Sequence, residues 1–94
     1  MKKDFNHWAA RAGMTAATLE NMAGGNAARA DFVTGVIEDL EGAYTPDGIG
    51  KWFARPRAQL GGKSPSEILS ADWTPAQEQP QRVKALSLSL RGGR

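Results

Sequence analysis

The sequence predicts an all-α fold, a small single domain of about five or six short helices around one longer helix at residues 27–43. Three observations support this prediction. Apolar residues recur with helical spacing in the central segment, three Ser-Pro or Thr-Pro steps give local helix starts, and no segment alternates apolar and polar residues as a strand does. A chain of 94 residues fits one domain rather than two.

The composition indicates a folded domain with a thin core. Leu, Ile, Val and Phe account for 16 of the 94 residues, yet the net charge is only +2 and three Trp add large apolar surfaces. We therefore expect part of the stability to come from a partner or a second copy of the chain. There is no Cys for a disulfide or a thiolate zinc site, and no apolar run long enough to span a membrane, so the expected location is the cytoplasm.

The charge is uneven along the chain. Residues 1–50 carry a net charge of −3, whereas residues 51–94 carry +5. A basic half is suited to nucleic acid or to an acidic protein surface, but scattered basic residues are equally typical of a solvated helical surface. The charge pattern alone leaves these interpretations open.

Residues 1–25 are expected to form two short helices, over 4–12 and 16–23, each ending at glycine. The first carries Phe5 and Trp8 on one side. The second has a single charged residue, and the segment is too short for a full helix-turn-helix. These helices therefore give little support to a DNA-reading module.

The longest predicted helix, 27–43, begins after Asn26, a favourable N-cap. Its apolar face has helical period and is predicted to be core. The residues of this face are Phe32, Val33, Val36, Ile37 and Leu40. The charged residues of the helix are expected to fall largely on other faces. They are Arg29, Asp31, Glu38, Asp39 and Glu41.

Three later steps place a hydroxyl cap before proline. They are Thr45-Pro46, Ser64-Pro65 and Thr74-Pro75. Proline is tolerated at the first helical position because the missing N–H has no helical partner there. Glu67 and Gln77 follow the second and third caps at the spacing of a capping box. The sequence therefore predicts three helix starts.

The helices after these starts end at recognisable residues. The first is expected to end near Arg55 because Pro56 follows, and a single helical turn and the Gly61-Gly62 reversal come next. The second helix is predicted over 65–71. Pro80 is expected to break the third segment, so that the last helix runs over 81–91.

The residue types favour a binding protein over an enzyme. The single histidine, His7, lies near the N-terminus, the acidic residues are dispersed, and the glycine pairs lack the context of a phosphate loop. We therefore expect no catalytic residue, no cofactor and no metal site. The candidate binding residues combine an aromatic anchor with basic donors, the types enriched in interface hot spots. They are Trp52, Arg55, Arg57 and Lys63.

The same stretch resembles a known family. Its motif is Trp-Phe-x-x-Pro-x-x-x-Leu-Gly-Gly-x-x-Pro-x-x-Ile-Leu over residues 52–69, followed by a final helix with Val83, Leu86 and Leu90. This pattern is similar to the Xre/MbcA/ParS-type antitoxin family, and more narrowly to its C-terminal toxin-binding domain. The resemblance covers roughly residues 27–93.

The resemblance implies a bacterial type II antitoxin, without enzymatic activity, that neutralises a RES-like, NAD-degrading toxin by covering its active-site cleft. It implies a toxin-binding domain at 26–94 with a flexible basic tail, acting as a homodimer within a hetero-oligomeric complex. In relatives the last helix and the tail approach the cleft. Carried over, this indicates Arg82, Leu86, Leu90, Arg91 and the tail Gly92–Arg94.

Two departures from the family pattern bear on function. Full-length relatives carry a helix-turn-helix ahead of this domain, and residues 1–25 are too few for one. Arg57 also stands where many relatives have Asn. Two alternatives therefore stay open, a small DNA-binding regulator and an orphan helical interaction module. Binding to duplex DNA that weakens steeply with salt would distinguish the first.

Overall fold

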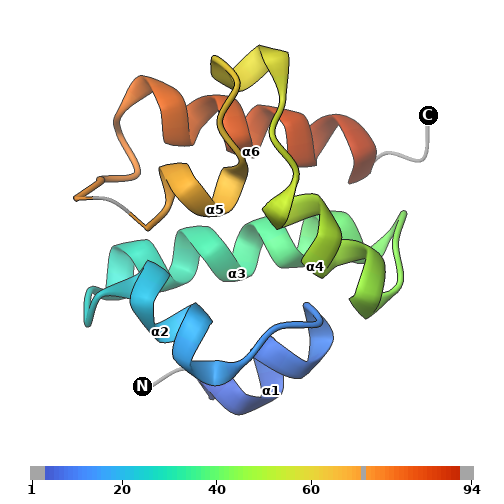
Figure 1. Ribbon diagram of the computed structural model, residues 1–94. Helices are drawn as coiled ribbons and strands as arrows, with labels where there is room; N and C mark the ends of the chain where they lie inside the picture. The colour runs from blue at the N-terminus through green and yellow to red at the C-terminus, as the bar shows by residue number, and fades with distance from the viewer. Residues whose placement is uncertain (1–3, 71, 92–94) are drawn as a thin grey trace.

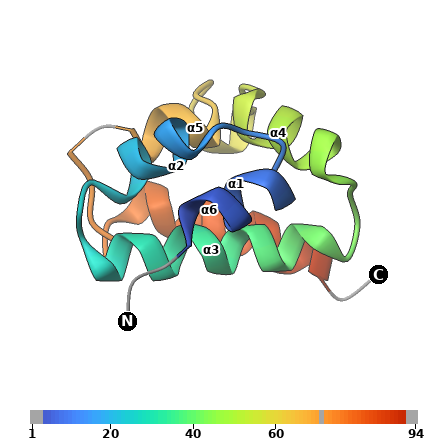
Figure 2. The same cartoon turned by 90° about the horizontal axis from the view of Figure 1, so that it is seen from below.

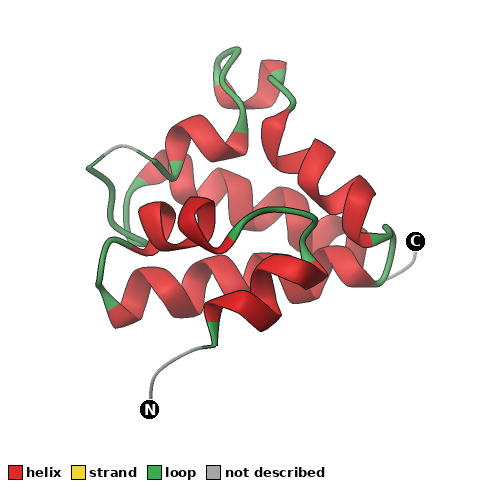
Figure 3. Cartoon of the chain, turned by 60° about the horizontal axis from the view of Figure 1, so that its bottom comes forward, coloured by secondary structure: helices red, strands yellow, loops and turns green. Residues whose placement is uncertain are grey.

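Helix α3 lies at the centre of the molecule. The computed structural model describes residues 4–70 and 72–91, without the side chain of Arg91. In chain order the elements are α1 (Phe5–Arg11), α2 (Ala16–Ala23), α3 (Ala27–Glu41), α4 (Pro46–Ala54), the 3-10 turn η1 (Ala58–Leu60), α5 (Pro65–Ile68) and α6 (Glu78–Arg91). Every regular element in the described residues is helical and none is a strand (Figure 3), which confirms the predicted all-α fold.

The two longest helices, α3 and α6, run side by side in the same direction (Figures 1 and 2). Helices α1 and α2 pack against α3 and against each other, and α4 also contacts α3. The short helix α5 packs against both α4 and α6. The predicted arrangement of short helices around the 27–43 helix is therefore confirmed, with the long helix ending at Glu41.

One core joins these helices, and the first two helices contribute to it. Ala9, Ala12, Leu19 and Met22 are fully or almost fully buried in the same cluster as the residues of α3. In the described chain after α3, the largest fully buried side chains are Phe53, Ile49, Leu60, Leu69, Trp73 and Val83. Phe32, which the helical pattern places on the core face, is only partly buried at its edge.

Two of the three predicted proline starts are confirmed. The Thr45 side chain accepts a hydrogen bond from the Gly48 N–H at 3.2 Å, and α4 begins at Pro46. At the second start, the Ser64 side chain accepts from the Glu67 N–H at 3.2 Å while the Glu67 carboxylate accepts from the Ser64 N–H at 2.8 Å. This reciprocal pair is a complete capping box.

The third predicted start is wrong. Thr74 and Gln77 close a turn, in which the Gln77 N–H donates to the Thr74 carbonyl at 3.2 Å, and α6 begins only at Glu78. Pro80 was expected to break the segment after Thr74, but it is the third residue of α6 and is buried. A proline fits there because the N–H groups of the first helical turn have no acceptor within the helix.

The expectation for Asp39 is also corrected, because this residue is fully buried between α3 and α6. Its carboxylate accepts hydrogen bonds from Lys84 Nζ at 2.8 Å and from Ser87 Oγ at 2.9 Å. The helical pattern of α3 could not show this, because α6 covers a face of α3 that its own sequence marks as polar. A buried carboxylate requires such partners, since it has lost its hydration.

Replacing Lys84 with methionine is expected to lower the free energy of unfolding by about 2 kcal/mol, because the buried Asp39 carboxylate loses its ion pair with this lysine. The double variant Asp39→Leu/Lys84→Met is expected to be more stable than Lys84→Met, since it removes the buried charge as well. Urea unfolding of both variants measures the difference. A single variant as stable as the wild type would show that this ion pair contributes nothing.

Candidate functional site

The candidate site is built on the connection between α4 and α5, residues 55–63, which we call the bridged loop. Its two ends are joined by an isolated antiparallel bridge, in which the Arg57 N–H donates to the Lys63 carbonyl at 3.1 Å. The Gly62 N–H donates back to the Arg57 carbonyl at 2.9 Å. Gly61 and Gly62 have φ of +69° and +85°, values that glycine adopts without strain. The loop is thus held by its own backbone.

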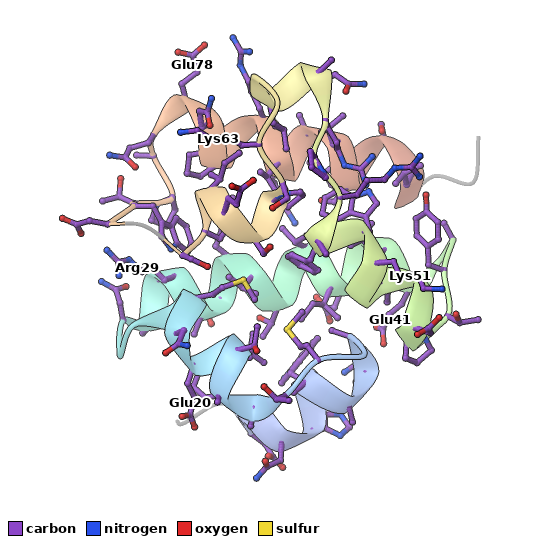
Figure 4. The ribbon with its side chains drawn as sticks, in the orientation of Figure 1. Glu20, Arg29, Glu41, Lys51, Lys63 and Glu78 are labelled. Carbon is purple, nitrogen blue, oxygen red and sulfur yellow. The ribbon has the colours of Figure 1, made fainter. Side chains whose placement is uncertain are left out.

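The bridged loop is also attached to α6. Arg82 Nη1 donates to the carbonyl of Gln59 at 3.5 Å, and η1 packs against α6. In Figure 4, Lys63 lies at the end of the molecule where α6 begins, near Glu78, and on a different side from Lys51 of α4. The structure therefore places the middle of the loop, η1, against α6 near Arg82.

The basic residues of this loop differ from the other described cations in having no ion pair. Five described Lys and Arg side chains each bind a carboxylate, and these are Arg11, Arg29, Lys51, Arg82 and Lys84. The three described ones that bind none are Arg55, Arg57 and Lys63. No acidic residue occurs between positions 48 and 66. The loop is thus a local excess of positive charge.

Arg57 is fixed on an aromatic support. Its guanidinium carbon lies 4.8 Å from the centroid of the Trp52 ring, and its Nη2 donates to the Trp52 carbonyl at 3.3 Å. The Nε atom of Arg57 is buried without a hydrogen-bond partner in the described part of the chain. Trp52 itself is only 4 % exposed and packs edge-on to Phe53. Trp52, predicted as an aromatic anchor for binding, is therefore a buried residue whose ring supports the arginine from the core.

Sequence reasoning missed one residue of this surface, Tyr44. Tyr44 is one of two large hydrophobic residues exposed in the described structure, at 40 %. The pKa of Arg57 is lowered by burial, raised by the charge of Tyr44 when ionised, and lowered by Arg55, so both residues lie within electrostatic range of its guanidinium. A single Tyr between two helices carries no pattern, and only the fold shows that it neighbours the loop.

The residues that the resemblance indicates on α6 have different environments. Arg82 is exposed and pairs with Glu78 at 2.5 Å, four residues earlier on the same helix. Leu86 and Leu90 are partly buried against the core, whereas Leu88, which was not predicted, is 47 % exposed. The side chain of Arg91 and the segment 92–94, with Arg94, lie outside the described residues.

Two other features, a metal-ligand group and a membrane-spanning helix, are absent from the described residues. These residues hold no group of three or more His, Cys, Asp or Glu side chains that could bind a metal ion. Among these same residues, no helix is both long enough and apolar enough to cross a membrane. His7, the only histidine, is exposed and lies 3.4 Å from Arg11 through its Nε2 atom.

Comparisons of the chain with protein families, with curated proteins and with solved structures gave no match. The function must therefore be argued from the bridged loop, from α6 and from the sequence motif.

Proposed function

We propose that this chain is a type II antitoxin that binds and neutralises a RES-like, NAD-degrading toxin, with the bridged loop as part of the toxin-binding surface. The observation that carries the proposal is the grouping of Arg55, Arg57 and Lys63, without ion pairs, on the loop that lies within the antitoxin-like motif. Every other described Lys and Arg already binds a carboxylate of its own chain, so these three are the ones available to a partner.

The shape of the loop supports a binding role. Its backbone bridge holds the loop, and the contact of Arg57 with the Trp52 ring holds that arginine, before any partner arrives, which reduces the entropy lost on binding. Arginine and tyrosine are also enriched among the residues that dominate interface energies. We further propose that α6 and the C-terminal tail help to cover the toxin cleft, and that the chain forms a homodimer within the complex.

Co-expression with a RES-domain toxin encoded beside this chain tests the proposal. We expect the wild-type chain to restore growth of cells that express the toxin and to co-purify with it as a stable complex. Failure of both readouts would refute the antitoxin function. Retention of the chain on duplex DNA, lost steeply as salt rises, would favour the regulator instead.

The double variant Arg55→Gln/Lys63→Gln is expected to weaken the toxin complex by about tenfold to a hundredfold, because it removes two cations from the interface. Both side chains are exposed, so folding should not change. Lys51→Gln is the matched control, an exposed lysine of α4 that is already paired with Asp47, and it should change affinity less than about twofold. Calorimetry on the purified proteins measures the affinity of each variant for the toxin. Equal affinities for the two variants would show that the loop is not part of the interface.

A further inference from the structure

We propose that Arg57, on the bridged loop, is a docking site for a carboxylate side chain of a partner protein. The inference deepens the proposed function by naming the chemical group that the bridged loop recognises, and it rests on that function for the partner being a protein. The site lies on the connection between α4 and α5.

Arg57 is a half-buried cation without an ion pair in the described chain, which is unfavourable. Burial lowers the pKa of Arg57, which reports that its charge has lost part of its hydration. The other partly buried cations of the described chain compensate for this loss with carboxylates, and these pairs are Arg11 with Glu41, Arg29 with Asp72 and Lys84 with Asp39. Arg57 has only the Trp52 carbonyl and the face of the Trp52 ring. A partner's carboxylate would therefore supply an interaction that the chain itself does not provide.

The guanidinium of Arg57 has a geometry that suits a carboxylate. The Nε atom is buried, so a partner reaches the terminal Nη groups. Nη2 donates to the Trp52 carbonyl and the guanidinium lies over the Trp52 ring, so two contacts restrict the position of the group. An arginine held in this way presents its N–H donors as a fork, which matches the two oxygens of a carboxylate. Lysine at this position could not present the same pair of donors.

The residue types around Arg57 favour a protein partner over nucleic acid. Tyr44 offers an exposed aromatic surface with a hydroxyl donor, and Arg55 adds a second positive charge. An aromatic residue and arginine together, over a buried tryptophan, are typical of a protein-interface hot spot. Binding to the phosphates of a duplex instead relies on several cations spread along the backbone, with little need for an aromatic support. The observations therefore favour a protein carboxylate.

The test uses the full-length chain labelled with nitrogen-15 and follows the Nε–H signals of arginine by NMR. The Arg57 signal is identified by its absence in Arg57→Lys. The probe is an acetylated, amidated hexaglutamate peptide, and the control is the corresponding hexaglutamine peptide. We expect the glutamate peptide to shift the Arg57 signal to saturation and the glutamine peptide to leave it unchanged.

The variants locate the site. Arg57→Lys keeps the charge but loses the fork and is expected to weaken peptide binding by about tenfold, and Tyr44→Ala by several-fold, while Lys51→Gln stays within about twofold of the wild type. An unmoved Arg57 signal, equal shifts with both peptides, or tighter binding of a 12-base-pair duplex at the same salt concentration would each overturn the proposal. No toxin is present, so this result and that of the co-expression experiment are separate.

Discussion

Replacing Trp73 with alanine is expected to lower the free energy of unfolding by about 4 kcal/mol. Trp73 follows α5 and is 2 % exposed, so its removal leaves a large cavity in a core that the composition already makes thin. Its Nε1–H donates to the Met22 carbonyl of α2 at 3.1 Å, and its ring packs edge-on to Phe32 of α3 at 5.3 Å between centroids. A small domain is stable by only about 5–15 kcal/mol, so the variant should be near its limit.

The variant Trp73→Phe separates packing from hydrogen bonding. It keeps an aromatic ring against Phe32 but leaves the Met22 carbonyl without this donor, and the expected loss is about 2 kcal/mol. Urea unfolding followed by circular dichroism measures both variants. If Trp73→Ala were no less stable than Trp73→Phe, the ring would not be the connection between α2, α3 and the segment before α6 that the contacts indicate.

The parts of the fold that the sequence predicts correctly are those that depend on neighbouring residues. The caps at Asn26, Thr45 and Ser64 each bind an N–H three residues later, so a short stretch of sequence contains the whole interaction. The predicted start of α6 is wrong although part of its cap forms. The Thr74 N–H donates to Gln77 Oε1 at 3.0 Å, as in a capping box, but the residues between them form a turn and the helix begins only at Glu78.

The candidate site divides in the same way. The sequence marks Arg55, Arg57 and Lys63 as basic residues on one connection, and the structure shows that the backbone bridge joins the ends of that connection. The sequence could not show that these cations lack ion pairs, because the carboxylates that pair with other cations come from distant positions. Arg29 pairs with Asp72, and Lys84 with Asp39. Tyr44 was missed because its proximity to Arg57 is a property of the fold.

Replacing Gly13 with alanine is expected to cost about 3 kcal/mol of stability. Gly13 has φ of +62°, a conformation that costs an alanine about 1 kcal/mol. Its new Cβ would also lie 2.3 Å from the carbonyl oxygen of Pro46 and 2.9 Å from the carbonyl carbon, both backbone atoms of the first turn of α4. Neither can rotate away as a side chain can, so the turn between α1 and α2 would have to move from α4.

Gly25→Ala is the matched control for this prediction. Gly25 has a similar φ of +69°, but a Cβ placed there meets no atom within 4 Å, so only the conformational cost of about 1 kcal/mol is expected. Urea unfolding of the two variants isolates the close approach of Gly13 to Pro46, because the backbone strain is common to both. Equal losses would mean that the α1–α2 turn does not rest on α4. A larger loss for Gly13→Ala would show that the α1–α2 turn packs closely against α4, the helix that leads into the bridged loop.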